Sequence, residues 1–196
     1  MKKGISLIVL IVTIIVIIIL AAAVILTLNR NNPIDSSRVS QLADNRASMN
    51  SAIQLYFGKV MAETQGVFET KDVFLGGSAD LNGTTKKVPR IVDATAVSTN
   101  FHKLTTKTGT NAEADAAATD STNGVKSTES ALDISVPGIS GATWYADVRS
   151  GLVYLVYSDY TSMPSWMFTD GSTKDAAHMD TTLATFVKAT ADLASI

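Results

Sequence analysis

Residues 5–28 read ISLIVLIVTIIVIIILAAAVILTL, an apolar stretch interrupted only by Ser6, Thr13 and Thr27. As an α-helix rising about 1.5 Å per residue, the stretch would extend about 36 Å, and the hydrocarbon core of a bilayer is about 30 Å thick. A buried core helix of a water-exposed domain is usually shorter and carries one polar face, whereas this stretch is apolar all round. The sequence therefore predicts a membrane-spanning helix at residues 5–28.

The flanking charges predict the orientation of this helix. Lys2 and Lys3 precede the stretch, and Arg30 follows it. Basic residues tend to stay on the cytoplasmic side of a membrane, so we expect the N-terminus inside and the residues after Leu28 outside.

The remaining chain, residues 29–196, has the size of one domain with its own core. The whole sequence carries 16 Lys and Arg against 18 Asp and Glu, and no long basic run follows the N-terminus. This mildly acidic balance gives nucleic-acid binding little support. The chain has no Cys, so outside the cytoplasm its stability must come from packing and not from disulfides.

The N-terminal sequence Lys2-Lys3-Gly4, followed at once by Ile5-Ser6 and the apolar stretch, resembles the type IV pilins and the related pseudopilins. In that family a short basic leader ends in glycine, and a membrane-bound prepilin peptidase cuts after the glycine on the cytoplasmic side. The resemblance implies a leader at residues 1–4, cleavage between Gly4 and Ile5, and methylation of the new N-terminus. It also implies that the helix at residues 5–28 anchors the precursor and then packs with copies of the chain or with related pilins in a filament.

One position departs from the family pattern. Pilins usually carry a glutamate five residues after the leader glycine, where it neutralises the N-terminal amine of a neighbouring subunit, and this chain has Val9 there. An uncompensated charge within an apolar bundle is costly. Three interpretations stay open: a minor, tip-located pilin, an amine that finds the hydroxyl of Ser6 or Thr13, or a chain that does not assemble as a pilin. For Thr13 we favour a hydroxyl bonded back to its own helix.

Two other kinds of N-terminus share several of these features. A cleaved signal peptide also begins with lysines, and Ala21-Ala22-Ala23 would serve as its cleavage site, but the apolar run continues through Val24-Ile25-Leu26. A plain single-pass anchor carrying an unrelated domain is the other alternative.

Pro33 predicts a break after the apolar stretch, because proline disfavours helical geometry in the residue before it. A second helix is expected from about Asp35 to Glu63, so that residues 29–65 form an amphipathic continuation ended by Gly66. A homodimeric coiled coil would give a similar stripe, but the strong pattern here is short. Arg46 occupies the one gap in the stripe and is expected to snorkel along the apolar face. The stripe consists of Val39, Leu42, Met49, Ile53, Tyr56 and Val60, and the polar face of Ser40, Asp44, Asn50 and Lys59.

The globular head is expected at residues 66–196, and its clearest signal is a β-hairpin. Residues 143–148 and 152–157 are rich in aromatic and β-branched side chains and flank Arg149-Ser150-Gly151. Gly151 suits the positive φ that such a loop requires. A sugar-binding role for these aromatic residues is an alternative to a place in the core. A strand is also expected to start within residues 88–92.

Two further segments are predicted near the C-terminus. Residues 162–168 suit an edge strand or a packed loop. An S-x-x-D pattern at Ser172 and Asp175 precedes a C-terminal helix expected from roughly Lys174 to Ala194. One face of that helix would carry Met179, Leu183, Phe186, Val187 and Leu193.

Catalysis finds little support in the sequence. His102 and His178 lack the spacing of metal ligands, and no cysteine accompanies them, so we expect no metal, no cofactor and no enzyme. Residues 138–141 miss the G-x-S-x-G nucleophile motif by one residue. Asn82-Gly83-Thr84 matches a short glycosylation pattern that often occurs by chance. The acidic start at Asp80 lacks the oxygen ligand that a calcium loop needs at its twelfth position.

The sequence thus predicts an α+β chain in which a long N-terminal helix packs on a head with a small antiparallel sheet. The resemblance implies a pilus-like filament subunit, processed at Gly4 and Ile5 from a precursor in the cytoplasmic membrane, with an extracellular head for adhesion or surface contact. The alternative is a single-pass, membrane-anchored binding module that stays unassembled.

Overall fold

The computed structural model describes residues 12–20, 33–88, 90–104 and 135–196. The chain divides into two compact units, residues 1–40 and 41–196, and the boundary falls within helix α2 (Pro33–Thr64). The predicted leader, both ends of the predicted membrane-spanning segment and the predicted break at residues 29–32 lie outside the described residues.

In the first unit, residues 12–20 are helical, and α2 begins at Pro33. Proline suits the first position of a helix because its missing N–H would have no intrahelical acceptor there. Asp35 lies in the first turn, where a negative charge is favourable, and its Oδ1 pairs with Nη1 of Arg38 at 3.3 Å. The prediction of a second helix from about Asp35 to Glu63 is confirmed.

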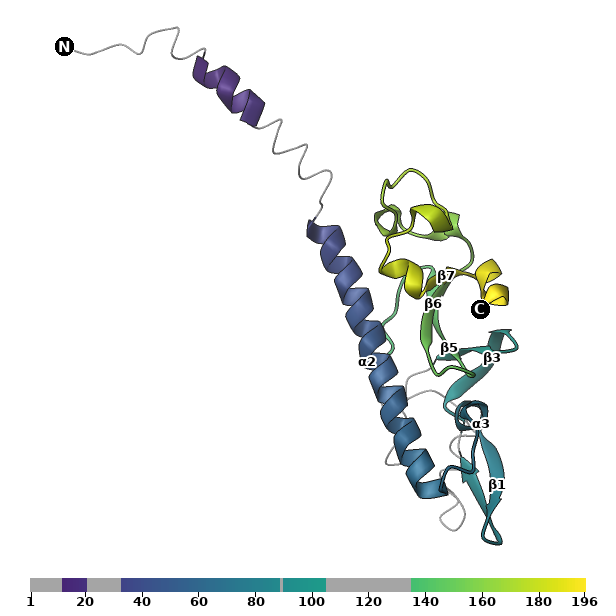
Figure 1. Cartoon of the computed structure of the whole chain (residues 1–196). Coiled ribbons are helices and arrows are strands. Elements are labelled where there is room, and N and C mark those ends of the chain that lie inside the picture. The colour runs from purple at the N-terminus through teal and green to yellow at the C-terminus, as the bar shows by residue number, and fades with distance from the viewer. Residues whose placement is uncertain (1–11, 21–32, 89, 105–134) are drawn as a thin grey trace, which may run out of the picture. The chain divides into compact units, whose positions relative to one another are not determined.

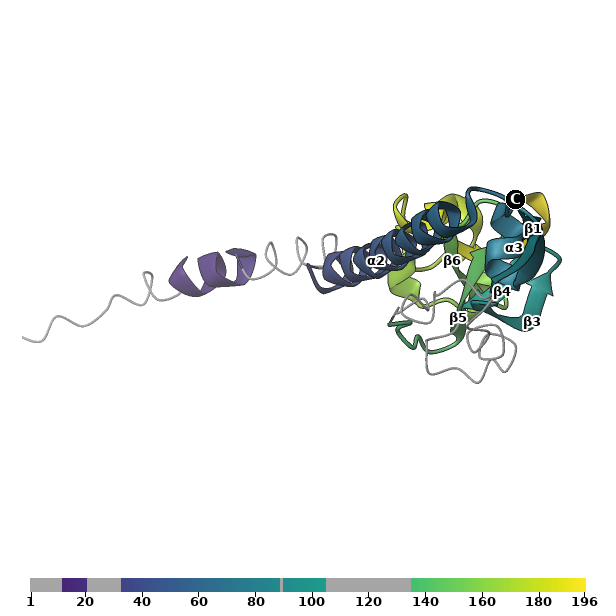
Figure 2. The same ribbon diagram turned by 90° about the horizontal axis from the view of Figure 1, so that it is seen from below.

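In the second unit, α2 buries most of the predicted stripe. Leu42, Met49, Ile53, Tyr56 and Val60 are all buried, because spacings of three, four and seven residues place them on one helix face. Figures 1 and 2 show this part of α2 beside the strands of the larger sheet. A long helix packed on a sheet, as the sequence predicts, is therefore present within this unit, but that sheet is the larger, mixed one and not a small antiparallel one.

The helix ends where the sequence predicts. Gln65 and Gly66 have φ values of 53° and 73°, and the N–H of Gly66 donates to the carbonyl of Met61 at 3.0 Å. This bond spans five residues and left-handed Gln65 precedes it, as in a Schellman ending. A short helix α3 (Thr70–Leu75) follows.

A separate two-stranded antiparallel sheet comes next, formed by β1 (Gly77–Leu81) and β2 (Thr84–Val88). Asn82 and Gly83 join the strands, and both have positive φ, as a type I′ turn requires. The glycosylation pattern therefore lies at a hairpin turn, where Asn-Gly has a structural reason to occur. The strand start that the sequence predicts within residues 88–92 is present at Val92, where β3 (Val92–Ser98) begins, whereas Val88 is the last residue of β2.

The larger sheet has five strands in the order β3-β4-β5-β6-β7. The pairings from β3 to β6 are antiparallel, and β7 pairs with β6 in parallel. The strands are β3 (Val92–Ser98), β4 (Phe101–Leu104), β5 (Ala142–Asp147), β6 (Val153–Tyr157) and β7 (Val187–Ala189). The fold is thus α+β, with a mixed sheet beside the small antiparallel one.

The predicted hairpin at residues 143–157 is confirmed as β5 and β6. Gly151 has a φ of 74°, and its N–H donates to the carbonyl of Asp147 at 2.8 Å. The buried carboxylate of Asp147 accepts bonds from the backbone N–H and Nε of Arg149, both at 3.1 Å, and from the Ser150 hydroxyl at 2.8 Å. The turn therefore carries its own polar network at the edge of the core.

The predicted C-terminal α-helix from about Lys174 to Ala194 is wrong. The structure has 3₁₀ turns η3 (Ala176–His178), η4 (Leu183–Thr185) and η5 (Thr190–Ser195) there, with β7 between the last two. All five residues of the predicted stripe are buried, but they belong to separate turns, their connections and the strand. Residues 162–168, predicted as an edge strand or packed loop, contain the last residue of η1 (Tyr160–Ser162) and the whole of η2 (Ser165–Met167).

The core of the second unit is built around β6, whose five residues are all buried. Trp144 of β5 stacks on Phe186 with ring centroids 6.3 Å apart, and Phe101 of β4 meets Tyr154 edge-on at 5.5 Å. The hairpin aromatics Trp144, Tyr154 and Tyr157 are buried, which favours the core interpretation over a sugar-binding surface.

Candidate functional sites

The residues that the pilin resemblance singles out for processing are Lys2, Lys3, Gly4 and Ile5. They lie outside the described residues, as does Val9. The described part of the same apolar stretch is residues 12–20.

Residues 12–20 form a helix whose apolar side chains are exposed. The exposed fractions of its large apolar residues run from 48% to 63%, and Thr13 is the one polar residue among them. A helix that is apolar all round is normally buried in protein or lipid, and exposed apolar surface of this kind usually marks an interaction site. Within the ranges that the structure describes, no helix has both the length and the apolar character needed to cross a membrane.

A second feature is the polar junction between α2 and β6. Asn50 Oδ1 accepts a hydrogen bond from the Val153 N–H at 3.0 Å, and Arg46 Nε donates to the Val153 carbonyl at 3.0 Å. Arg46 and Asn50 are one helical turn apart, so both side chains leave α2 on the same side. Two helix side chains therefore satisfy both backbone groups of one strand residue.

The position of β7 explains why Val153 needs these partners. The N–H of Leu155 donates to the Phe186 carbonyl at 2.9 Å on the β7 side of β6, and β7 pairs with β6 only from Leu155 onward. Backbone groups of residues two apart in a strand point to the same side, so those of Val153 face the space before β7 begins. The side chains of Arg46 and Asn50 therefore make the hydrogen bonds to Val153 that a neighbouring strand would otherwise make.

Arg46 also contacts two aromatic rings. Its guanidinium carbon lies 5.0 Å from the centroid of Phe186 and 5.9 Å from that of Tyr154. Partial burial lowers the pKa of the Arg46 guanidinium, which stays protonated, and the ring faces and the Val153 carbonyl stabilise its positive charge. The predicted snorkelling of Arg46 is thus a specific contact with the sheet.

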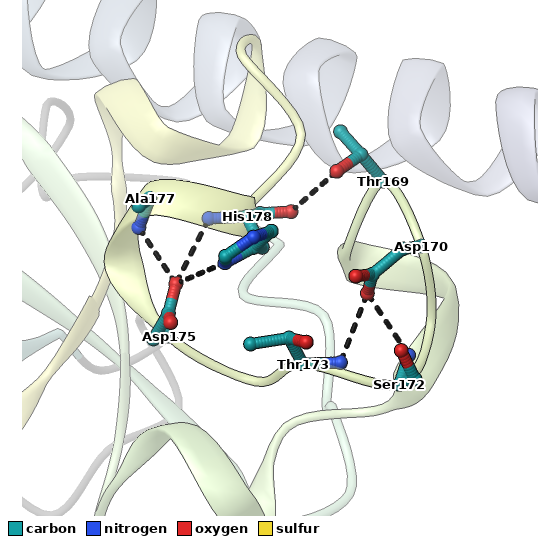
Figure 3. A network of polar contacts seen from close by, with 7 residues as sticks. All are labelled: Thr169, Asp170, Ser172, Thr173, Asp175, Ala177 and His178. Atoms are coloured by element: carbon teal, nitrogen blue, oxygen red, sulfur yellow. Dashed lines mark hydrogen bonds and ion pairs between the residues drawn. The ribbon is translucent and has the colours of Figure 1, made fainter.

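The third feature is a surface loop at residues 169–180, named here the capped loop. An antiparallel bridge between Phe168 and Met179 closes its base, where the Thr169 N–H donates to the His178 carbonyl at 2.8 Å and the Asp180 N–H donates to the Met167 carbonyl at 2.8 Å. Figure 3 shows the polar contacts within it.

Two aspartates organise the capped loop by accepting backbone N–H groups. Asp170 Oδ1 accepts from Ser172 and Thr173 at 3.0 and 2.9 Å, and these bonds lower the pKa of Asp170. Asp175 Oδ1 accepts from Ala177 and His178 at 2.9 and 3.0 Å and lies 2.7 Å from His178 Nδ1. The His178 contact is the main cause that lowers the pKa of Asp175, and the same contact raises the pKa of His178.

Neighbouring turns hold the capped loop to the rest of the unit. Lys174 Nζ donates to the carbonyls of Met163 and Thr161 at 2.6 and 3.2 Å. In η1, the Tyr160 hydroxyl donates to Asp192 Oδ2 at 2.5 Å, which ties the turn to η5. Burial and then this bond raise the pKa of Tyr160 to about 12.

The two histidines lie in different elements and have different partners. His102 lies in β4 with Nδ1 at 3.2 Å from the Asp93 carbonyl, whereas His178 belongs to the capped loop. No cluster of three or more His, Asp or Glu side chains within residues 12–20, 33–88, 90–104 and 135–196 is placed to hold a metal ion.

Comparison of the chain with protein-family models, with curated proteins and with solved structures gives no match.

Sequence reasoning missed the role of Asn50, which it placed on the polar face of α2. The signal that remains visible in the sequence is a pair of polar side chains, Arg46 and Asn50, four residues apart at the border of an apolar stripe. It also missed the capped loop, whose signal is the spacing of Asp170, Asp175 and Asp180, each of which caps the turn that follows it.

Proposed function

We propose that the chain is a structural subunit of a type IV pilus-like filament. The carrying observation is the helix at residues 12–20, which exposes every one of its large apolar side chains within a longer apolar stretch. Such a surface needs lipid or other apolar helices around it, and a filament subunit meets both in turn: lipid before assembly and neighbouring helices afterwards.

In this proposal the precursor sits in the cytoplasmic membrane with its N-terminus inside and its head outside. A prepilin peptidase cuts between Gly4 and Ile5, and Lys2 and Lys3 supply the leader charge. Copies of the chain or related pilins then associate through the apolar helix, and the head provides adhesion or surface contact. The proposal assigns the head no catalytic step and no cofactor.

The fold is compatible with this role. Helix α2 follows the apolar stretch in sequence and is fastened to β6 by Arg46 and Asn50, so the head is built on the same chain segment that would enter the filament. The chain has no cysteines, and the described surface turns of the head are held by aspartate caps and by a lysine bound to backbone carbonyls.

Val9 favours a second candidate function. A chain without the usual carboxylate near its N-terminus lacks the common way of neutralising a buried amine. The alternative is therefore an extracellular binding module held singly in the membrane by the same apolar helix. Sheared filaments separate the two proposals, because they should contain a pilin and lack an unassembled anchor.

The first experiment is intact mass measurement with N-terminal sequencing of the protein from its native cells. A chain that starts at Ile5, with or without an added methyl group, supports prepilin processing. A start at Met1 contradicts it and favours the plain anchor, and a start near Val24 indicates a secreted domain.

Replacement of Gly4 adds a test of the cleavage position. Gly4→Leu should leave the leader uncut, because the family's peptidase reads the glycine before the cut. Ser6→Ala is the matched control and should mature normally. Normal maturation of Gly4→Leu would count against the proposal.

A further inference from the structure

Both the backbone and the ring of His178 make hydrogen bonds that hold the capped loop (residues 169–180) closed. Its carbonyl accepts from the Thr169 N–H at 2.8 Å and from the Thr169 hydroxyl at 3.1 Å. Its backbone N–H and its ring Nδ1 both meet Asp175 Oδ1, at 3.0 and 2.7 Å. One residue therefore joins the base of the loop to the cap inside it, as Figure 3 shows.

The acceptor at the centre of this arrangement is a single carboxylate oxygen. Asp175 Oδ1 receives three donors, from Ala177 and twice from His178. Hydrogen bonds to an ionised partner are stronger than neutral ones, so a proton on the imidazole strengthens the contact between ring and carboxylate. A neutral ring with its hydrogen on Nδ1 can still donate, but the attraction between opposite charges is then lost.

The other charged or titratable groups around the pair favour the protonated ring or stay unchanged with pH. Asp170, on the same loop, attracts the charge on His178. Asp175 is one of the groups that raise the pKa of Tyr160 in η1, and this tyrosine donates to Asp192 and stays neutral because its pKa is about 12. Lys174 is held by the carbonyls of Met163 and Thr161.

We propose that Asp175 and His178 form a proton-controlled clasp, which holds the capped loop closed in mildly acidic surroundings and loosens it as the surroundings become alkaline. The clasp is independent of filament assembly, because every contact in it lies within residues 169–180. Its consequence is a head surface whose order changes with pH.

The direction follows from the two pKa shifts. The pKa of His178 is raised, chiefly by its bond with Asp175, so its stabilisation is complete below the ordinary value of 6.5 and is lost as the pH rises through the raised pKa. The pKa of Asp175 is lowered, chiefly by the same bond, so its stabilisation is present above 3.8 and is lost as the pH falls through the lowered pKa. The closed loop is therefore most stable between these two ordinary values. Because both side chains are partly exposed, salt should weaken the effect.

The test is NMR of the full chain in detergent micelles. Amide exchange of Thr169 and Asp180, corrected for the intrinsic pH dependence, should be slower at about pH 5 than at about pH 8. His178→Gln should remove this difference, and His102→Gln is the matched control that should keep it. Protection that is independent of pH in the wild-type chain would overturn the proposal.

A second measurement guards against a variant that disturbs the loop for other reasons. Titration of the His178 ring signals should give a lower pKa in Asp175→Asn than in the wild-type chain, because the amide keeps the size of the carboxylate and removes its charge. The same His178 pKa in both proteins would show that the pair does not act as a clasp.

Discussion

At Asn50, one side-chain oxygen determines whether the N–H of Val153 has a partner. Asn50→Leu keeps a side chain of similar size and removes the acceptor that lies 3.0 Å from that N–H. A partly buried donor left without a partner costs about 1–2 kcal/mol. We expect the free energy of unfolding to fall by that amount, measured in urea for the full chain in micelles through the fluorescence of its two tryptophans, of which Trp144 is buried.

The matched control at this position is Asn50→Asp. The carboxylate keeps an acceptor oxygen in the same place, and it lies near the guanidinium of Arg46, one helical turn away. This variant should lose much less stability than Asn50→Leu at neutral pH. Equal losses in both variants would mean that the Val153 bond does not contribute to stability.

The roles of Arg46 and Asn50 also show where prediction from sequence ends at the residue scale. Helical periodicity assigns each residue to a face of α2, and on that basis Arg46 borders the stripe and Asn50 belongs to the polar face. The partner of both is the backbone of Val153, 103 residues from Asn50. No local pattern encodes that β7 begins too late to pair with Val153.

At the scale of elements, the turn between β5 and β6 requires a glycine for two reasons: a positive φ and the lack of space for a side chain. Gly151 has a φ of 74°, and a Cβ built on it would lie 3.0 Å from Phe57 Cε2 of α2. Gly151→Ala therefore combines backbone strain of about 1–2 kcal/mol with a steric conflict against the half-buried ring of Phe57. The two costs add, so we expect this variant to lower the free energy of unfolding by roughly more than 2 kcal/mol. The same urea measurement checks it.

Gly66, which follows α2, is the control for Gly151, because it also has a positive φ but has room for an added Cβ. Its φ is 73°, and nothing described lies within 4 Å of an added Cβ. Gly66→Ala should cost about 1 kcal/mol, the backbone contribution alone. If the two variants lose the same stability, the contact between Phe57 and the turn is not tightly packed.

The elements that sequence reasoning predicts correctly are those whose signals are local. The α2 stripe has a regular helical period, and the β5–β6 hairpin has two alternating strands around a glycine. The C-terminal region fails because Met179, Leu183, Phe186 and Leu193 fall on one helical face by spacing, although separate turns bury them. Asp175, Asp180 and Asp192 accept nearby backbone N–H groups and so favour short turns over one helix. Parallel pairing of β7 with β6 is a long-range property without a local signal.

At the scale of the whole molecule, the two units place different demands on their surroundings. Among the described residues of the second unit, the side chains of β6 are buried, and the turns at Asp147 and Asp175 are closed by the unit's own polar groups. The helix at residues 12–20 in the first unit exposes its apolar side chains. The composition of residues 5–28 alone predicts this demand for an apolar environment, although it does not say whether lipid or protein meets it.

Ile17→Lys tests that demand directly. Ile17 lies near the middle of residues 5–28 and is 63% exposed. A lysine at the centre of a membrane helix costs roughly 2.5–3.5 kcal/mol on insertion scales, whereas leucine is favourable. We expect the wild-type chain and Ile17→Leu to remain in the membrane pellet after an alkaline wash and Ile17→Lys to shift to the supernatant. A wild-type chain that is washed out as a monomer would contradict both proposed functions, because each requires residues 5–28 to be held in lipid before any assembly. Retention of all three proteins would instead mean that the segment tolerates a charge at its centre, as a helix surrounded by other subunits or lying close to the membrane surface would.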